Sequence, residues 1–364
     1  TYQREGAASF TDEFGKVVIV GDNAPRFDHD PTTRESKGLL IEHSRTNLYT
    51  YSSNLSSDVG WGNTRITVTV NTTTTPDKTN SASTLTVNSG GSYAYAYVNF
   101  TTNSGTSYAV SGWFKYINCQ YVWLLGGEQQ DYFAYFDIQN GTIGTTNGYD
   151  CTITAYPDGW YRCTATRTKS GSTGSEQIGF GLTRSNNNPT NNQVGDAVYA
   201  WGAQQEVGAF PSSYIPTNGS SVTRGADYTV LLNDDFTDAI NQTEGTLIAE
   251  YDNVTSDGYV LSLDGSGGDK IGMVNSNSYQ LMGTAGGSSQ GTTDNGTLLS
   301  GTNRFALAYK LNDTGISING NTATVDTNYT LPTTTFMSIG HREYQYDQLG
   351  SCIARIMYYN TRLP

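Results

Sequence analysis

The chain has few charged residues and no long apolar run. Charged side chains make up 15% of its 364 residues, so hydroxyl and amide groups have to hydrate its surface. No apolar stretch approaches the ~20 residues of a transmembrane helix, and we expect no membrane insertion. Long runs of Ala, Leu, Glu and Lys are also missing, which disfavours a helical fold.

Residues typical of catalytic and metal sites are sparse as well. No nucleophile–base pair or metal-ligand cluster stands out, and the histidines and cysteines are few and lack CxxC spacing, which argues against a zinc site. They are His29, His43 and His341, and Cys119, Cys151, Cys163 and Cys352. Cys151 and Cys163 bracket a predicted hairpin and could form a disulfide. A fully reduced, buried set is an equal alternative if the protein assembles in a cytoplasm.

The net charge of −13 narrows the range of partners. A nucleic-acid binder needs a basic surface, and docking on anionic lipid needs positive charge, so we expect neither partner. The chain begins at Thr1 without an initiator methionine or a signal peptide. From this we expect a fragment or a processed product.

Abundant residues point to an all-β fold. The chain has 41 glycines and 26 tyrosines, with Asn, Thr and Ser throughout, a composition typical of short strands joined by tight turns. We predict two jelly-roll-like β-sandwich domains in tandem with an extended N-terminal arm. The predicted boundaries are an arm at 1–50, a first sandwich at 51–215, a linker with one short helical turn at 216–243, and a second sandwich at 244–364.

Several phrases of the sequence resemble those of a known group of proteins. They are PRFDHDPTTRESKGLLIEHSRTNL (25–48), DGWYRCTAT (158–166), WGAQQEVGAFPSSYIPTNGSSVTRGAD (201–227), RFALAYKLNDTGISINGNTATVD (304–326) and IARIMYYNTRLP (353–364). The first three are similar to a carbohydrate-binding-module-like sandwich of tailed-phage tail-fibre, tail-spike and minor tail proteins. The last two resemble the concanavalin A/laminin-G-like sandwich that often follows that module.

This resemblance implies a virion protein without enzymatic activity, in a tail fibre, tail spike or capsid decoration. Its sandwiches would attach the particle to host surface glycan. The expected partners are other virion proteins and further copies of the chain, most simply as a trimer. One alternative is a structural assembly module without a ligand. Another is a polysaccharide-degrading enzyme of the concanavalin A-like group, which should carry paired glutamates in an ExDxxE-type pattern that this chain lacks.

The row Tyr93, Tyr95 and Tyr97 is the clearest candidate for glycan binding. Side chains alternate in a strand, so the three tyrosines share one face at ~6.5 Å spacing and the intervening alanines share the other. Phenol rings suit stacking on sugar rings. Alternatively, the tyrosines face the interior of the sandwich, or they lie in a subunit interface.

Five further aromatic residues are weighed in the same way. Trp123, beside the turn GGEQQD, is expected to be exposed and to join the glycan site. Tyr344 and Tyr346 are candidates for a second aromatic patch, with a solvated loop as the alternative. Trp160 and Trp201 are expected to anchor the core.

The acidic residues offer no recognisable catalytic pair. Those considered are Glu128, Asp131, Asp137, Asp264, Asp269 and Asp347. A glycosidase needs two carboxyl groups at a defined separation, and no glycosidase motif accompanies these residues. Asp264 and Asp269, in DGSGGDK, are instead candidates for a structural Ca²⁺ site, although the loop lacks the EF-hand spacing and its closing Glu. We expect no other cofactor.

Overall fold

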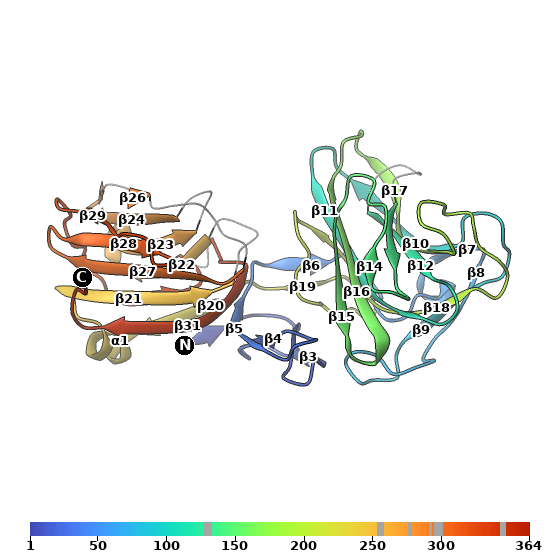
Figure 1. Cartoon of the computed structure of the whole chain (residues 1–364), viewed down its shortest axis with the longest axis horizontal. Coiled ribbons are helices and arrows are strands. Elements are labelled where there is room, and N and C mark those ends of the chain that lie inside the picture. The colour runs from blue at the N-terminus through green and yellow to red at the C-terminus, as the bar shows by residue number, and fades with distance from the viewer. Residues whose placement is uncertain (127–132, 253–257, 276–278, 291–292, 295–300, 343–346) are drawn as a thin grey trace.

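In the computed structural model the chain is all-β and forms two sandwiches that lie end to end (Figure 1). The structure describes residues 1–126, 133–252, 258–275, 279–290, 293–294, 301–342 and 347–364. Within these ranges α1 (Asn233–Ala239) is the one α-helix, at the place where the sequence predicts a helical turn. Three short 3-10 turns are η1 (Ser57–Val59), η2 (Pro157–Gly159) and η3 (Ser266–Gly268).

The first sandwich consists of two six-stranded antiparallel sheets. In spatial order one sheet, here called the platform sheet, contains β14 (Thr142–Ile143), β13 (Ala134–Asp137), β12 (Tyr121–Gly126), β17 (Gly174–Thr183), β10 (Tyr95–Thr102) and β7 (Gly62–Thr64). The other, the backing sheet, contains β15 (Asp150–Tyr156), β16 (Trp160–Thr168), β11 (Ser107–Tyr116), β18 (Ala197–Val207), β9 (Ser83–Val87) and β8 (Ile66–Thr69). Apolar side chains fill the space between them, including Ala96, Leu124 and Phe180 from the platform sheet and Val110 and Phe114 from the backing sheet.

The second sandwich also consists of two antiparallel sheets. One contains β29 (Thr324–Asp326), β28 (Thr314–Ile318), β27 (Asn303–Lys310), β21 (Glu244–Tyr251), β31 (Ser351–Tyr359), β5 (Ser36–Ile41) and β4 (Phe27–His29). The other contains β1 (Tyr2–Gln3), β20 (Tyr228–Leu232), β30 (Phe336–Ile339), β22 (Gly258–Asp264), β23 (Lys270–Asn275), β24 (Tyr279–Ala285) and β25 (Ser288–Ser289), with β26 (Thr293–Asp294) also paired to β24. Its separate core includes Leu247, Phe305 and Ile316 from the first sheet and Leu261 and Met273 from the second.

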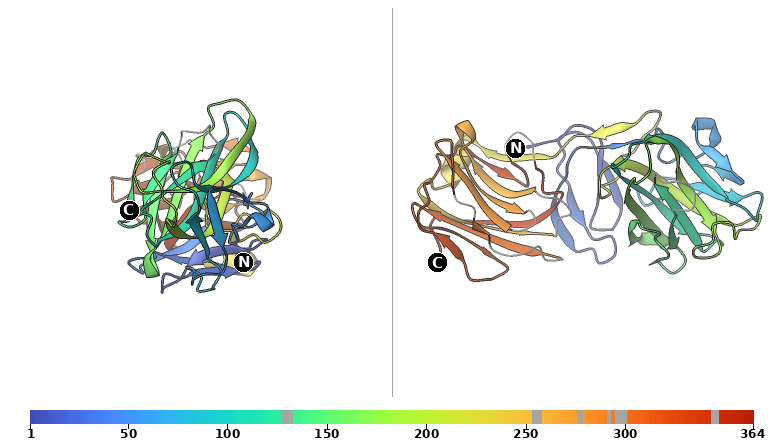
Figure 2. Two further views of the ribbon diagram at one scale, coloured as in Figure 1. Left: turned by 90° about the vertical axis from the view of Figure 1, so that its right-hand side faces the viewer. Right: turned by 90° about the horizontal axis from the view of Figure 1, so that it is seen from above.

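The N-terminal region is more ordered than the predicted extended arm. Residues 1–50 form six short strands: β1, β4 and β5 complete the sheets of the second sandwich, β2 (Ala8–Thr11) and β3 (Val17–Val20) form a hairpin, and β6 (Arg45–Asn47) pairs with β19 (Val222–Arg224). Figure 2 shows this region between the two sandwiches. Strands from 1–50 and from 216–243 therefore take part in the sheets of the second sandwich, and the division into domains stays a prediction.

A buried group of ionic side chains, here called the junction cluster, holds this region together. It contains Arg4, Arg26, Glu42, Arg224 and Asp227. Arg26 Nη1 lies 2.7 Å from Glu42 Oε2 and its Nη2 lies 2.5 Å from Asp227 Oδ2, while Arg224 also pairs with Glu42. Burial opposes ionisation of Glu42, but Arg224 and Arg26 outweigh it and hold the pKa of the carboxyl well below its usual range. The cluster joins residues 25–48 to residues 201–227. These two stretches, which the sequence marks by their resemblance to phage proteins, therefore meet in the region between the two sandwiches.

The four cysteines are free. Burial raises the pKa of Cys119 and of Cys151 to about 12, and raises that of Cys163 and of Cys352 well above its usual range. We expect four thiols to react with a thiol reagent after unfolding, but only slowly in the native protein, and we expect reducing agent to leave the melting temperature unchanged. Fewer than four thiols in the unfolded protein would mean that a disulfide had formed.

Candidate functional site

The outer side of the platform sheet carries a row of aromatic side chains. Residues directly opposite each other in an antiparallel sheet point to the same side. Tyr95 lies opposite Gly181, Gly181 opposite Trp123, and Trp123 opposite Tyr135. The row therefore crosses β10, β17, β12 and β13, and the glycine in its middle leaves space for the neighbouring rings.

The tyrosines of the predicted row lie on this outer side. Ala94 and Ala96 are buried in the core between the two sheets, whereas Tyr93, Tyr95 and Tyr97 are half-buried on the opposite side. The alternative in which these tyrosines face the interior is therefore wrong. The physical reason is volume: Ala96 lies opposite the large Phe180 in the core, which leaves no room for a second ring there.

Trp123 is not exposed, contrary to the sequence prediction. Only 1% of the Trp123 surface is accessible to solvent. Neighbouring rings cover it: its ring centroid lies 4.3 Å from that of Phe133 and 5.5 Å from that of Tyr95. Leu125 and Tyr135 complete the same cluster. Its Nε1 is buried and has no hydrogen-bond partner among the described residues. The indole thus covers Gly181 and packs beside Tyr95. Any direct contact between Trp123 and a ligand would require its neighbours to move.

Tyr95 and Tyr97, which are neighbours along β10, are the accessible aromatic side chains on this outer side of the sheet. Their ring centroids are 5.1 Å apart, and the Tyr97 ring lies directly over Gly62, where an added Cβ would be 2.4 Å from Tyr97 Cζ. The Tyr95 hydroxyl donates to Gln177 Oε1 at 2.7 Å, and burial raises the pKa of this phenol. The cavity beside Tyr95 measures only about 10 Å³, so a ligand would stack on this surface rather than enter it.

Hydrogen-bonding groups flank the aromatic row. Tyr121 lies opposite Asp137, two residues along each strand from Trp123 and Tyr135, and this pair is therefore on the same side of the sheet. Gln120 Nε2 and Asn140 Nδ2 donate to Asp137 Oδ2 at 2.7 and 2.9 Å. Burial works against the charged form of Asp137, but these hydrogen bonds outweigh it and lower the pKa of the carboxyl. The strand ends beside the row therefore hold an ordered carboxylate and amides.

Gly181 is required by the packing of the row. A Cβ at this position would lie 2.0 Å from Cε2 and Cζ2 of Trp123. We expect Gly181→Ala to lower the free energy of unfolding by about 1–3 kcal/mol, the usual cost of overpacking, and to change the tryptophan fluorescence. Gly174→Ala is the matched control in the same strand, because its nearest neighbouring atom is 4.0 Å away. Equal stability of the two variants would contradict this packing.

The structure places the other predicted residues as follows. Trp160 and Trp201 are buried, which confirms them as core residues. Tyr344, Tyr346, Glu128 and Asp131 lie outside the described residues. Phe133, Tyr135 and Gln177 were not predicted from the sequence. The alternation in YFAYFDI (132–138) was a usable signal, because it places Phe133 and Tyr135 on one side of a strand.

The proposed calcium ligands are not brought together as a metal site. Asp264 is buried, and its two carboxylate oxygens accept hydrogen bonds from the hydroxyls of Ser262 and Ser338, each at 2.6 Å. Asp269 accepts a long hydrogen bond of 3.4 Å from the Gly287 amide. Among the described residues, no group of three or more His, Cys, Asp or Glu side chains could hold a metal ion. Asp264 is better described as a hydrogen-bonded core carboxylate.

Comparisons with known proteins return structures but no families. No protein-family profile matches the chain, and no curated protein matches it. Mouse laminin α1 chain, domains LG4-5, aligns with 9% identity and a TM-score of 0.27, covering 76% of this chain and 90% of that one. Sialidase of Trypanosoma rangeli in complex with the inhibitor DANA aligns with 14% identity and a TM-score of 0.29, covering 78% of this chain and 59% of that one. TM-scores this low say nothing about activity, substrate or partner.

One expectation from the sequence is corrected by these comparisons. The sequence predicts that the chain is not an enzyme. A sialidase is among the matched structures, so we do not conclude that this chain lacks catalytic activity. At 14% identity the same alignment does not assign an activity either.

No helix in the described ranges has the length and apolar composition needed to cross a membrane.

Proposed function

We propose that this chain is an adhesive component of a tailed-phage particle, and that the outer side of its platform sheet binds host surface glycan. The observation that carries the proposal is the position of Tyr95 and Tyr97. They lie half-buried and adjacent to each other on the outer side of the sheet, with Trp123 packed beside Tyr95 and with Gly62 beneath the Tyr97 ring. Rings held in this way lose little further freedom when they stack on a sugar.

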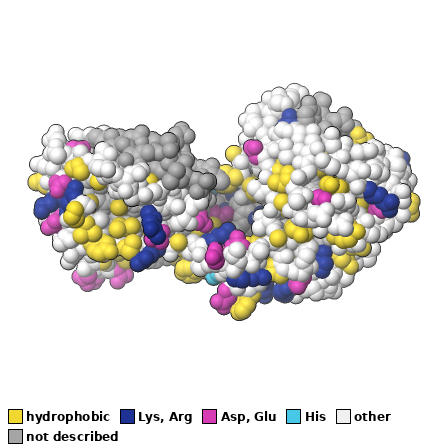
Figure 3. All heavy atoms as spheres, in the orientation of Figure 1, with side chains coloured by type: hydrophobic (Ala, Val, Ile, Leu, Met, Phe, Trp, Pro, Cys, Tyr) yellow, Lys and Arg dark blue, Asp and Glu magenta, His cyan; other side chains and the backbone are white. Residues whose placement is uncertain are grey.

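The general character of the molecular surface also suits a sugar. Figure 3 shows a face of the molecule dominated by uncharged polar side chains and backbone, with charged side chains in small groups. The net charge of −13 disfavours acidic polysaccharide, although screening at physiological salt limits this repulsion to about 8 Å. The proposed ligand is therefore a neutral or cationic surface glycan.

Binding at one shallow site would be weak, so the proposal includes display of several copies. Multivalent display raises avidity by about 10²–10⁴ without new contacts. The trimer rests on the resemblance to fibre and spike proteins alone. The apolar centre of residues 37–42 gives no independent reason for it, because β5 pairs with β31 of the same chain and Ile41 is buried there.

A glycan array probed with the full chain tests the proposal, together with light scattering of the same sample and immunogold electron microscopy of particles. We expect signals for neutral or cationic glycans, a mass above that of one chain, and label on the particle surface. An array without signal from an oligomeric, particle-bound protein would favour the structural assembly module. Absence of label from particles would overturn the virion assignment.

A further inference from the structure

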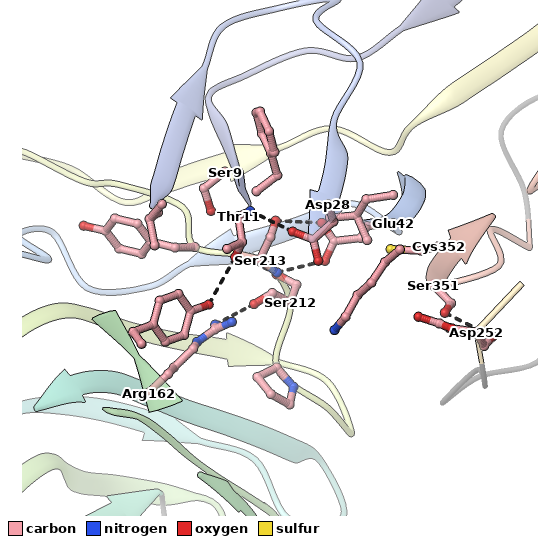
Figure 4. A pocket seen from close by; sticks show the side chains of 18 of the residues that line it. Ser9, Thr11, Asp28, Glu42, Arg162, Ser212, Ser213, Asp252, Ser351 and Cys352 are labelled. Carbon is pink, nitrogen blue, oxygen red and sulfur yellow. Dashed lines mark hydrogen bonds between the residues drawn. The ribbon is translucent and has the colours of Figure 1, made fainter. Parts of the chain in front are cut away.

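A cavity of about 310 Å³ lies where the N-terminal region, the first sandwich and the second sandwich meet. Figure 4 shows side chains from all three parts around it. Thr11 comes from β2, Arg162 from β16 and Asp252 from the residue that follows β21. Its volume falls at the lower end of the ~300–1,000 Å³ that is typical of ligand sites. A small ligand here would contact both sandwiches.

Several donors at this cavity have no partner in the described part of the chain. The Lys37 ammonium forms no hydrogen bond or ion pair there. Arg162 donates through Nη2 to the carbonyl of Ser212 at 2.7 Å and packs over the Trp113 ring at 4.7 Å. Its Nε and the Nε1 of Trp113 are buried without a hydrogen-bond partner. Buried polar atoms are usually paired, so the buried Nε of Arg162 and Nε1 of Trp113 point to a missing polar molecule, and the half-buried Lys37 ammonium is available to the same molecule.

The charges lining the cavity balance each other. Lys37 and Arg162 are matched by Asp28 and Asp252, and these four form no ion pairs with other described residues. Asp28 Oδ1 accepts a hydrogen bond from the Thr11 amide at 2.7 Å. The remaining carboxylate, Glu42, is already neutralised by two arginines. A charged ligand would therefore gain no net attraction here, whereas a molecule with both donors and acceptors could satisfy both sets of groups.

Hydroxyl groups supply further contacts around the cavity. The Tyr156 hydroxyl and Thr11 Oγ1 share a long hydrogen bond of 3.4 Å, which is weaker than one of ordinary length. Ser9, Ser212 and Ser351 also line the space. We propose that this junction cavity binds one uncharged sugar unit, held by Lys37, Arg162, Asp28 and the Tyr156 hydroxyl. This site is separate from the outer side of the platform sheet.

Saturation-transfer NMR and calorimetry on the full chain test this site. The probes are glucose, galactose, mannose and N-acetylglucosamine, with glucuronate and glucosamine as charged comparisons. We expect at least one neutral sugar to bind at millimolar concentration, and more tightly than its charged counterpart. Lys37→Met and Tyr156→Phe should each weaken that binding about tenfold, since each removes a hydrogen bond to the ligand. Both substitutions spare the junction cluster, and circular dichroism checks their folding.

Tyr97→Ala separates the two sites, because it alters only the outer side of the platform sheet. Sugar binding that persists in Tyr97→Ala and is lost in Lys37→Met belongs to the cavity. Three results would overturn the proposal: no neutral sugar binds, a charged sugar binds more tightly, or Lys37→Met and Tyr156→Phe bind as the unmodified chain does. When they are measured in the Tyr97→Ala background, these results do not depend on whether the outer side of the platform sheet binds glycan.

Discussion

Tyr97→Ala is expected to weaken glycan binding by about tenfold at each site while the protein stays folded. The ring lies over Gly62 and beside Tyr95, so its loss removes stacking area without opening the sandwich core. An aromatic contact contributes about 0.5–1.5 kcal/mol beyond the burial of its area, and 1.4 kcal/mol corresponds to a factor of ten. In an oligomer the loss at every site would remove most of the avidity. Array intensity and calorimetry measure both effects.

Two variants serve as controls for this result. Tyr97→Phe keeps the ring and should retain most of the binding. Asn99→Ala changes an exposed residue two positions along the same strand, and should bind as the unmodified chain does. Trp123→Ala is unsuitable, because truncating a buried tryptophan costs about 3–5 kcal/mol of stability. Unchanged binding by a folded Tyr97→Ala protein would place any glycan site elsewhere.

Glu42→Gln is expected to lower the free energy of unfolding by about 3–5 kcal/mol, the usual cost of removing one partner from a buried ion pair. Glu42 accepts from both Arg26 and Arg224 and from the amide and hydroxyl of Ser213. Without the negative charge of Glu42, the positive charges of the buried Arg26 and Arg224 guanidinium groups would no longer be balanced. Urea unfolding measures the change.

The stabilisation by Glu42 should also depend on pH. Its pKa is lowered in the folded protein, so the unfolded chain binds more protons in acid and stability rises with pH. The advantage of the unmodified chain over Glu42→Gln is thus complete above about pH 4.3, the ordinary glutamate pKa, and declines as the pH falls below it. The control is Asp158→Ala, which breaks the largely exposed pair with Lys78 and should cost less than about 1 kcal/mol. Equal losses in the two variants would contradict the role of the junction cluster.

The burial of Trp123 could not be predicted from the local sequence. Its neighbourhood in the chain, beside a polar turn, favoured exposure. Its burial depends on Phe133, which is ten residues away, and on Tyr95 in a strand that does not adjoin β12. Contacts between rings on different strands depend on which strands lie side by side, and a local pattern does not contain that information.

The junction cluster was hidden for the same reason. Arg26 and Asp227 are separated by 201 positions in the chain yet share a hydrogen bond of 2.5 Å. The two stretches that contain these residues were recognisable in the sequence by their resemblance to phage proteins. Neither sequence indicated that the two stretches contact each other in the fold. Pairing of residues so distant in sequence is decided by the assembled sheets.

By itself the sequence determined the all-β class and the positions of most strands. It also determined that Tyr93, Tyr95 and Tyr97 share one side of a strand, because side-chain alternation is a property of the local backbone. Only the tertiary structure decided which side faces solvent. That choice depends on Phe180 and Phe114, which fill the core opposite Ala96, and close packing leaves room there for a methyl group but not for a phenol.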